Sequence, residues 1–120
     1  MKLTTTNLLA LTAAFASADP SLETRANQDM KHCMEKAPNV HKAIEKFCKK
    51  TDMVVPSNYA HMGETVGNTF IQIMGPCDPP QWVPQQACWS QFHHICRHGN
   101  SRGEGTKQYG RQGCQEWVIG

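Results

Sequence analysis

Apolar residues recur with helical spacing between residues 83 and 99, which read VPQQACWSQFHHICRHG. On a helix, five side chains of this segment share one arc: Cys88, Trp89, Phe92, Ile95 and Cys96. Pro84 suits the first helical position, and Gly99 suits the residue that follows the last turn. The pattern predicts a helix over residues 83–99 whose apolar arc, Trp89 included, lies in the core.

A second helical pattern begins at Pro38 and continues through Ile44 and Phe47. It predicts a helix over residues 38–50 that packs its apolar face against the first helix. The chain before Pro38 is polar and has little to bury. We therefore expect a flexible N-terminal arm over residues 19–29, followed by only a short helical turn.

Strand patterns are short and lie at four places: residues 52–56, 64–66, 69–74 and 114–119. Gly67-Asn68 favours a hairpin turn between the second and the third. The facing of the last strand stays open, because Gln115 and Trp117 fall on the same side. Three segments rich in turn-forming residues are expected to be loops: residues 57–63, 75–81 and 99–113.

Together these elements predict an α+β fold, with two main helices packed on a small antiparallel sheet of roughly three to five strands. No repeat or second domain is visible, so residues 30–120 are expected to form a single disulfide-rich domain.

The N-terminus reads as a targeting segment. An apolar run, LLALTAAFA, is followed by the small residues Ala16-Ser17-Ala18. This pattern predicts a secretory signal peptide over residues 1–18, and the run is too short to span a bilayer. Removing residues 1–18 from the 120 leaves 102 residues and an extracellular protein. Whether a second cut follows Arg25 stays open.

All six cysteines lie after the predicted cleavage site: Cys33, Cys48, Cys77, Cys88, Cys96 and Cys114. An even number in a short secreted chain indicates three disulfides, and no C-x-x-C pair supports a zinc site. Six cysteines allow fifteen pairings. If the two predicted helices are antiparallel, Cys48 lies near Cys88 and Cys33 near Cys96, and Cys77 is left to join Cys114.

The charge is nearly balanced, with 11 Lys and Arg against 10 Asp and Glu after residue 18. This balance argues against a general nucleic-acid binder, whose affinity depends on neutralising phosphates. We expect a monomer with no membrane or nucleic-acid partner and no cofactor.

Histidines are the densest polar group, and His94 and His98 have the i, i+4 spacing that can hold a metal. The sequence shows no third ligand, so we expect exposed histidines and no metal site. The stretch from Tyr59 through His61 to Glu64 is locally similar to the Tyr-x-His stretch of small secreted fungal guanyl-specific ribonucleases. Acid–base cleavage of RNA would also need a second histidine and an arginine, for which His98 and one of Arg97 or Arg102 are the candidates.

Aromatic side chains suggest a different activity, because indole faces stack on sugar rings. Trp82 lies between Pro79-Pro80 and Pro84, which restrict its backbone and favour an exposed, ordered side chain. Tyr109 and Arg111, in the glycine-rich segment, are the expected stacking and hydrogen-bonding partners. We therefore predict a binding surface made by Trp82, Tyr109 and Arg111, with no catalytic residue.

Three cysteine motifs extend this interpretation: A-I-x-x-F-C at residues 43–48, C-x3-F-x2-I-C at 88–96 and C-x2-W-x-I at 114–119. Together they resemble the small secreted cysteine-rich proteins of filamentous fungi. Some of those are effector candidates, and one group is similar to secreted glycan-binding lectins. The resemblance implies a non-catalytic binding protein with an extracellular glycan as ligand. The alternatives are a ribonuclease-like protein, active or degenerate, and an effector or inhibitor that binds a host protein.

Overall fold

The structure is a computed structural model of the chain, and it describes residues 21–120. The predicted signal peptide lies outside these residues. In chain order the elements are α1 (Leu22–Lys36), α2 (Pro38–Phe47), β2 (Val54–Val55), α3 (Asn58–Met62), β3 (Glu64–Val66), β4 (Thr69–Met74), β5 (Gln81–Trp82), α4 (Gln85–His98), β6 (Gly105–Tyr109), the 3-10 helix η2 (Arg111–Gly113) and β7 (Gln115–Ile119).

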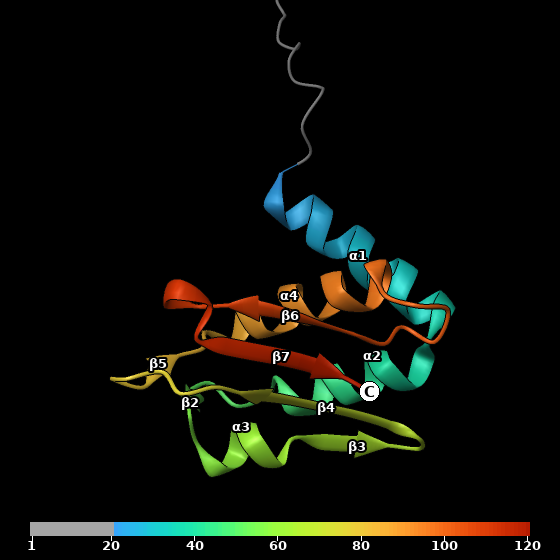
Figure 1. Ribbon diagram of the computed structural model, residues 1–120. Coiled ribbons are helices and arrows are strands. Elements are labelled where there is room, and N and C mark those ends of the chain that lie inside the picture. The colour runs from blue at the N-terminus through green and yellow to red at the C-terminus, as the bar shows by residue number, and fades with distance from the viewer. Residues whose placement is uncertain (1–20) are drawn as a thin grey trace, which may run out of the picture.

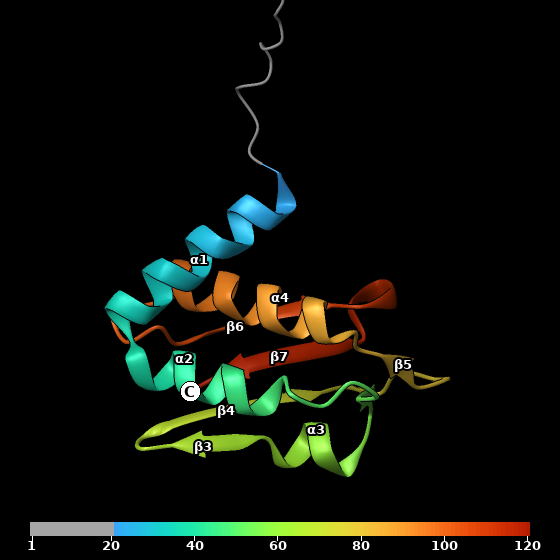
Figure 2. The ribbon, with the colours of Figure 1, turned by 180° about the vertical axis from the view of Figure 1, so that it is seen from behind.

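The predicted α+β fold is confirmed. Four strands form an antiparallel sheet in the order β3-β4-β7-β6, and α2 and α4 cover one of its faces (Figures 1 and 2). β2 and β5 form a separate two-stranded antiparallel sheet at one end of the molecule. Among residues 21–120, no helix has the length and apolar character that crossing a membrane requires.

The core lies between the four-stranded sheet and the two helices that cover it. Phe92 of α4 packs its ring 4.6 Å from that of Trp117 and 5.7 Å from that of Phe47 (centroid distances). The open question about β7 is settled by its burial pattern, because Gln115, Trp117 and Ile119 are all buried. Gln115 satisfies its amide oxygen there by accepting a hydrogen bond from the Trp117 indole (2.8 Å).

The expected arm over residues 19–29 is wrong where the structure describes it, because α1 begins at Leu22 and continues to Lys36. The hydroxyl of Ser21 caps the helix by accepting a hydrogen bond from the Thr24 N–H (3.1 Å). The buried stripe of α1 packs on α4 and consists of Ala26, Asp29 and Cys33. A small residue, a charged one and a cysteine give little hydrophobic signal, which is why a third main helix was not expected.

Each of the three predicted loops contains part or all of a strand or helix that sequence reasoning missed. Residues 99–113 hold β6, which pairs along its whole length with β7. Glycines flank that strand, and Gly103 has φ 75° and packs so closely on Cys96 and Ala37 that a Cβ there would lie 2.9 Å from each. Residues 57–63 contain α3, which is capped by Ser57 and buries Ala60.

The connector over residues 75–81 ends in a third missed element, β5. Its two residues pair with β2, and Trp82 lies opposite Val54. The predicted strand over residues 52–56 is thereby confirmed in a shorter form, as β2. The hairpin is confirmed as well, with Gly67-Asn68 as the turn between β3 and β4.

All three disulfides have the predicted pairing: Cys33–Cys96, Cys48–Cys88 and Cys77–Cys114. The first two join α4 to α1 and to the C-cap residue of α2. The second links the C-terminal end of α2 to the first turn of α4, as antiparallel packing of these helices predicts. The third joins the connector before β5 to the residue before β7. Within residues 21–120, α1 and α2, the helices that pack most extensively on α4, are therefore both cross-linked to it covalently.

The intact mass of the oxidised protein should be about 6 Da below that of the fully reduced chain, because three disulfides remove six hydrogens. Mass spectrometry before and after reduction gives this difference. A free thiol that reacts under denaturing conditions would contradict the pairing.

Candidate functional site

Trp82, the first predicted binding residue, is exposed and held in place. Its side chain is 61% exposed, and its indole N–H donates a hydrogen bond to the carbonyl oxygen of Thr51 (2.8 Å). The backbone is fixed by pairing with Val54 and by the bond from the Val83 N–H to the Met53 carbonyl (2.8 Å). One face of a rigid aromatic ring is thus available to solvent.

Arg111 lies at the same end of the molecule. Its backbone N–H donates to Oε1 of Gln81 (3.1 Å), the residue before Trp82. The side-chain amide of Gln115 donates to the same oxygen (3.1 Å). The Gln81 side chain therefore joins β5 to η2 and β7, close to the Cys77–Cys114 disulfide, and the Arg111 side chain remains exposed.

Tyr109, the third predicted binding residue, faces a different surface. Because β6 pairs with β7, Tyr109 lies on the helix-facing side of the sheet, with its ring 5.0 Å from that of Trp117. It is half-buried, and this burial raises the pKa of its hydroxyl above the ordinary value, with a further rise from the Asp29 carboxylate. Within residues 21–120 the predicted trio is therefore divided, with Tyr109 in a groove under α1.

This groove runs between α1, α4 and β6 and has a volume of about 810 Å³. Its walls include Leu22, Ala26 and Asp29 from α1, Ala87 and His94 from α4, and Tyr109 from β6. α1 and α4 diverge from their linked C-terminal ends (Figures 1 and 2), and this divergence opens the groove.

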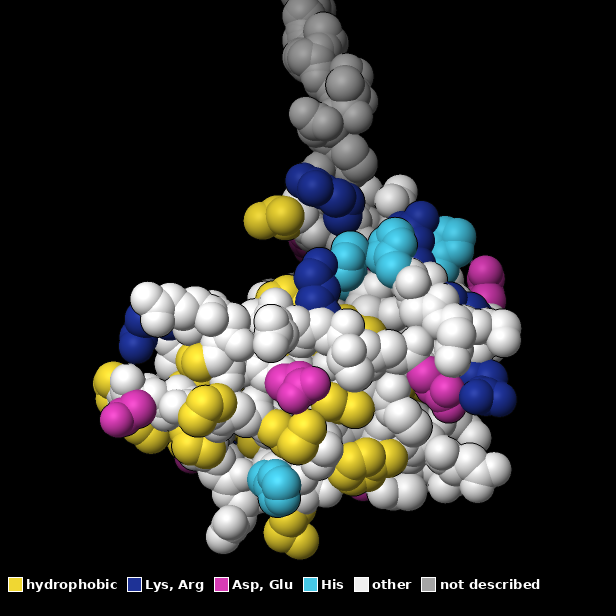
Figure 3. Space-filling view, viewed as in Figure 1, with side chains coloured by type: hydrophobic (Ala, Val, Ile, Leu, Met, Phe, Trp, Pro, Cys, Tyr) yellow, Lys and Arg dark blue, Asp and Glu magenta, His cyan; other side chains and the backbone are white. Residues whose placement is uncertain are grey.

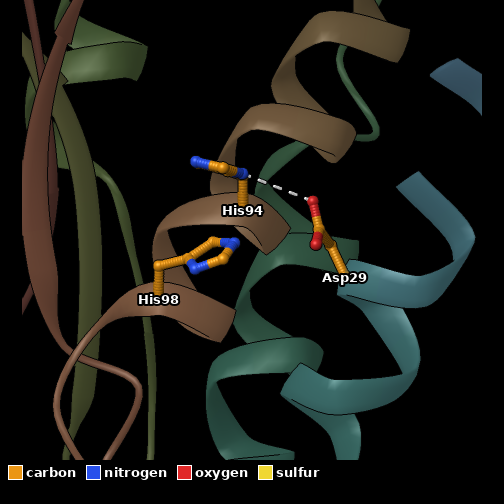
Figure 4. Close-up of side chains that lie close together, drawn as sticks. All are labelled: Asp29, His94 and His98. Atoms are coloured by element: carbon orange, nitrogen blue, oxygen red, sulfur yellow. Dashed lines mark ion pairs between the residues drawn. The ribbon is translucent and has the colours of Figure 1, made fainter. Parts of the chain in front are cut away.

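Asp29, His94 and His98 form a cluster where α1 and α4 meet (Figure 4). One ligand atom from each, a carboxylate oxygen or a ring nitrogen, lies within 4.8 Å of the other two. The Asp29 Oδ2 is 3.5 Å from Nδ1 of His94, and the two imidazole centroids are 4.4 Å apart. Partial desolvation lowers the pKa of His98, and the neighbouring His94 lowers it further. Asp29 is therefore a candidate for the third ligand that the sequence did not show.

Asp29 is buried because a cation neutralises it. Nη1 of Arg97 lies 3.0 Å from Asp29 Oδ1, and this pair joins the two helices. A carboxylate buried without such a partner would be strongly destabilising. The only sequence signal for its position is the spacing to Cys33, four residues later, which places both on one helical face.

His93, which precedes His94 on α4, is buried in the core. Its Nδ1 donates to the carbonyl oxygen of Trp89 (2.8 Å), so its Nε2 is left to accept from Nδ1 of His41 (2.9 Å). Burial lowers the pKa of His93 from 6.5 to about 4, with a contribution from His41, so the ring is neutral at pH 7.

Trp89 is only partly buried, which corrects its assignment to the core. It lies at the edge of the core, with its ring 4.6 Å from that of His93. Its indole N–H donates to Glu45 Oε2 (2.7 Å) on α2, a carboxylate that also lies 3.9 Å from Nε2 of His41. The fully buried tryptophan of residues 21–120 is Trp117.

The residues of the ribonuclease alternative do not come together. His61 lies in the last turn of α3 and Glu64 begins β3, at the edge of the molecule opposite α1 in both views (Figures 1 and 2). Arg97 is paired with Asp29, and His98 belongs to the cluster on α1 and α4. Arg102 pairs with Glu104. His61 and Glu64 are therefore on a different surface from His98 and Arg97.

No family model, curated protein or solved structure matches the chain. The resemblance to small secreted cysteine-rich fungal proteins stays a prediction, and the case for a function rests on the geometry described above.

Proposed function

We propose that this is a secreted, non-catalytic binding protein that recognises an extracellular glycan at the surface around Trp82. Secretion is supported by the signal-like N-terminus and by three disulfides with no free cysteine in residues 21–120. A small domain held by disulfides tolerates an oxidising, protease-rich environment. The α+β scaffold would serve to present a fixed surface.

The observation that carries this proposal is the combination of exposure and rigidity at Trp82. An indole that is 61% exposed leaves a large apolar face in contact with water, which a bound sugar ring would cover. Its N–H is already bonded to Thr51, so the ring loses little conformational entropy when a ligand docks. Stacking on the C–H face of a sugar needs only that free face.

Exposed polar groups at the same end of the molecule as Trp82 would supply the hydrogen bonds that sugar hydroxyls require. The exposed Arg111 side chain extends from η2, whose backbone is bonded to Gln81, and Asp78 is exposed just before β5. Tyr109 faces the groove under α1, so it is not part of the proposed binding surface. The site then consists of Trp82 and Arg111, with Asp78 as an additional acceptor.

A glycan array probed with the oxidised protein tests the proposal, followed by affinity measurements on the oligosaccharide that it selects. Trp82→Ala should weaken binding by about 1–3 kcal/mol, the size expected of a central aromatic. Met62→Ala is the matched control, because Met62 is 73% exposed but lies on α3. Both variants should keep the native thermal midpoint within a few degrees.

The proposal is wrong if the native protein binds no glycan on the array. It is equally wrong if Trp82→Ala and Met62→Ala bind the selected oligosaccharide as tightly as the native protein does.

A further inference from the structure

We propose that Asp29, His94 and His98 bind one divalent transition-metal ion of the zinc type. The inference is independent of the glycan proposal, because the cluster lies where α1 and α4 meet, whereas Trp82 lies on β5. It rests on the ligand geometry, on the covalent link beside the cluster and on the accessibility of the site.

The ligand set suits zinc. Bonds of about 2.0–2.2 Å place the atoms of a tetrahedral site roughly 3.3 Å apart. Asp29 Oδ2 and His94 Nδ1 are already 3.5 Å apart, and the three ligand atoms lie within 4.8 Å of one another, so modest side-chain rotations would close the site. Two imidazoles and one carboxylate leave a fourth position open, and such a set favours zinc or copper over calcium and magnesium.

The Cys33–Cys96 disulfide fixes the two helices that carry the ligands. Cys33 follows Asp29 by one turn of α1, and Cys96 lies midway between His94 and His98 on α4. The Cα atoms of the two cysteines are 5.5 Å apart, so α1 and α4 cannot separate at the cluster. Binding a metal would then cost little backbone entropy.

Arg97 orients the carboxylate but also opposes a cation. Its guanidinium lies 3.0 Å from Asp29 Oδ1 and leaves Oδ2 directed toward His94 (Figure 4), an outer-shell arrangement that fixes a ligand. Its positive charge lowers the affinity for any cation. The predicted site is therefore selective for metals that bind imidazole strongly and do not depend on carboxylate charge alone.

The site can be reached from solvent. His98 is exposed, and Asp29 and His94 both line the groove between α1, α4 and β6. Histidine side chains gather near the base of α1 on the molecular surface (Figure 3). An ion can therefore enter without any helix moving.

A second group, His41, Glu45 and His93, has a similar composition but a different geometry. The nitrogens of His41 and His93 are 2.9 Å apart, a hydrogen-bond distance shorter than two ligands on one zinc ion would adopt. Both ring nitrogens of the buried His93 are already used, one by His41 and one by the Trp89 carbonyl. This group therefore serves as an internal control.

Titration calorimetry of the oxidised protein with Zn²⁺ tests the inference. We expect one ion per molecule and a rise in thermal midpoint with added zinc, because only the folded protein assembles the site. His94→Ala/His98→Ala should weaken binding by about 100-fold or more, at or beyond the 10–100-fold loss typical of an outer-shell partner. His61→Ala, which removes an exposed histidine on α3, and His41→Gln should leave the affinity unchanged.

Asp29→Asn, nearly the same shape without the charge, should also weaken zinc binding, and its melting curve without zinc shows whether α1 stays folded. If that variant loses structure, the double histidine variant decides, because it alters only side chains at or near the surface. Native protein that binds zinc no more tightly than the double variant would overturn the inference. Loss of binding in His41→Gln with retention in the double variant would move the ion to the other group and overturn it too.

Discussion

Trp117→Ala is expected to lower the free energy of unfolding by about 3–5 kcal/mol, the usual cost of deleting a large aromatic side chain from a core. Trp117 is 1% exposed, and its ring contacts those of Phe92 and Tyr109. The change would also leave the Gln115 amide oxygen, now bonded to the indole, without its donor. Urea denaturation of the oxidised protein measures the loss.

Trp89→Ala is the matched comparison, because it removes the same side chain from the edge of the core. Its cost should be at most about half as large, since water already reaches part of that ring. A Trp89→Ala variant that loses more stability than Trp117→Ala would show that the core has been assigned to the wrong residues.

Acidification from pH 7 to pH 4 is expected to lower the free energy of unfolding by about 3 kcal/mol through His93 alone. The pKa of this histidine is lowered from 6.5 to about 4, chiefly because burial disfavours the charged ring. Between pH 6.5 and pH 4, His93 is protonated in the unfolded chain but neutral in the folded protein. The free energy of unfolding therefore falls as the pH falls. About 2.5 pH units at 1.36 kcal/mol each set the size of the effect.

His93→Phe separates this effect from other titrations. The variant should be less stable at pH 7, because His41 and the Trp89 carbonyl lose a partner, but its stability should change less between pH 6.5 and pH 4. The difference between the two urea-unfolding profiles isolates His93, since His98, whose pKa is also lowered, is common to both proteins. A chelator keeps metal from the Asp29 cluster. Parallel profiles would contradict the assignment of a buried neutral histidine.

Local patterns were sufficient to predict much of this fold. The arc of Cys88, Phe92 and Cys96 defines one face of α4. The dipeptide Gly67-Asn68 strongly favours the turn that joins β3 to β4. The assumption that residues 38–50 and 83–99 form antiparallel helices placed Cys48 near Cys88 and Cys33, which precedes Pro38, near Cys96. The structure has the same pairing, with Cys33 on a separate helix, α1.

What the sequence did not reveal depends on contacts between distant segments. α1 buries Asp29, which is stable there only because Arg97 arrives from α4. β6 carries exposed polar residues, including Thr106 and Gln108, and becomes a strand by pairing with β7 at the edge of the sheet. Neither feature leaves a hydrophobic period in its own segment.

In the candidate sites too, features set by local sequence were predictable and features set by distant contacts were not. Exposure of Trp82 was predictable, because prolines on both sides are a local restriction. The place of Tyr109 was not, since it depends on which face of β6 turns toward the helices. The Asp29, His94 and His98 cluster combines a recognisable pair on one helix with a residue 65 positions before its nearer member.

The central claim, recognition of a glycan at Trp82, is tested most directly by the indole N–H signals in nuclear magnetic resonance. Each tryptophan donates to a different acceptor: Thr51 for Trp82, Glu45 for Trp89 and Gln115 for Trp117. During titration with the oligosaccharide selected on the array, the Trp82 signal should shift to saturation while the other two stay in place. A Trp82 signal that does not move while the oligosaccharide binds would contradict the account.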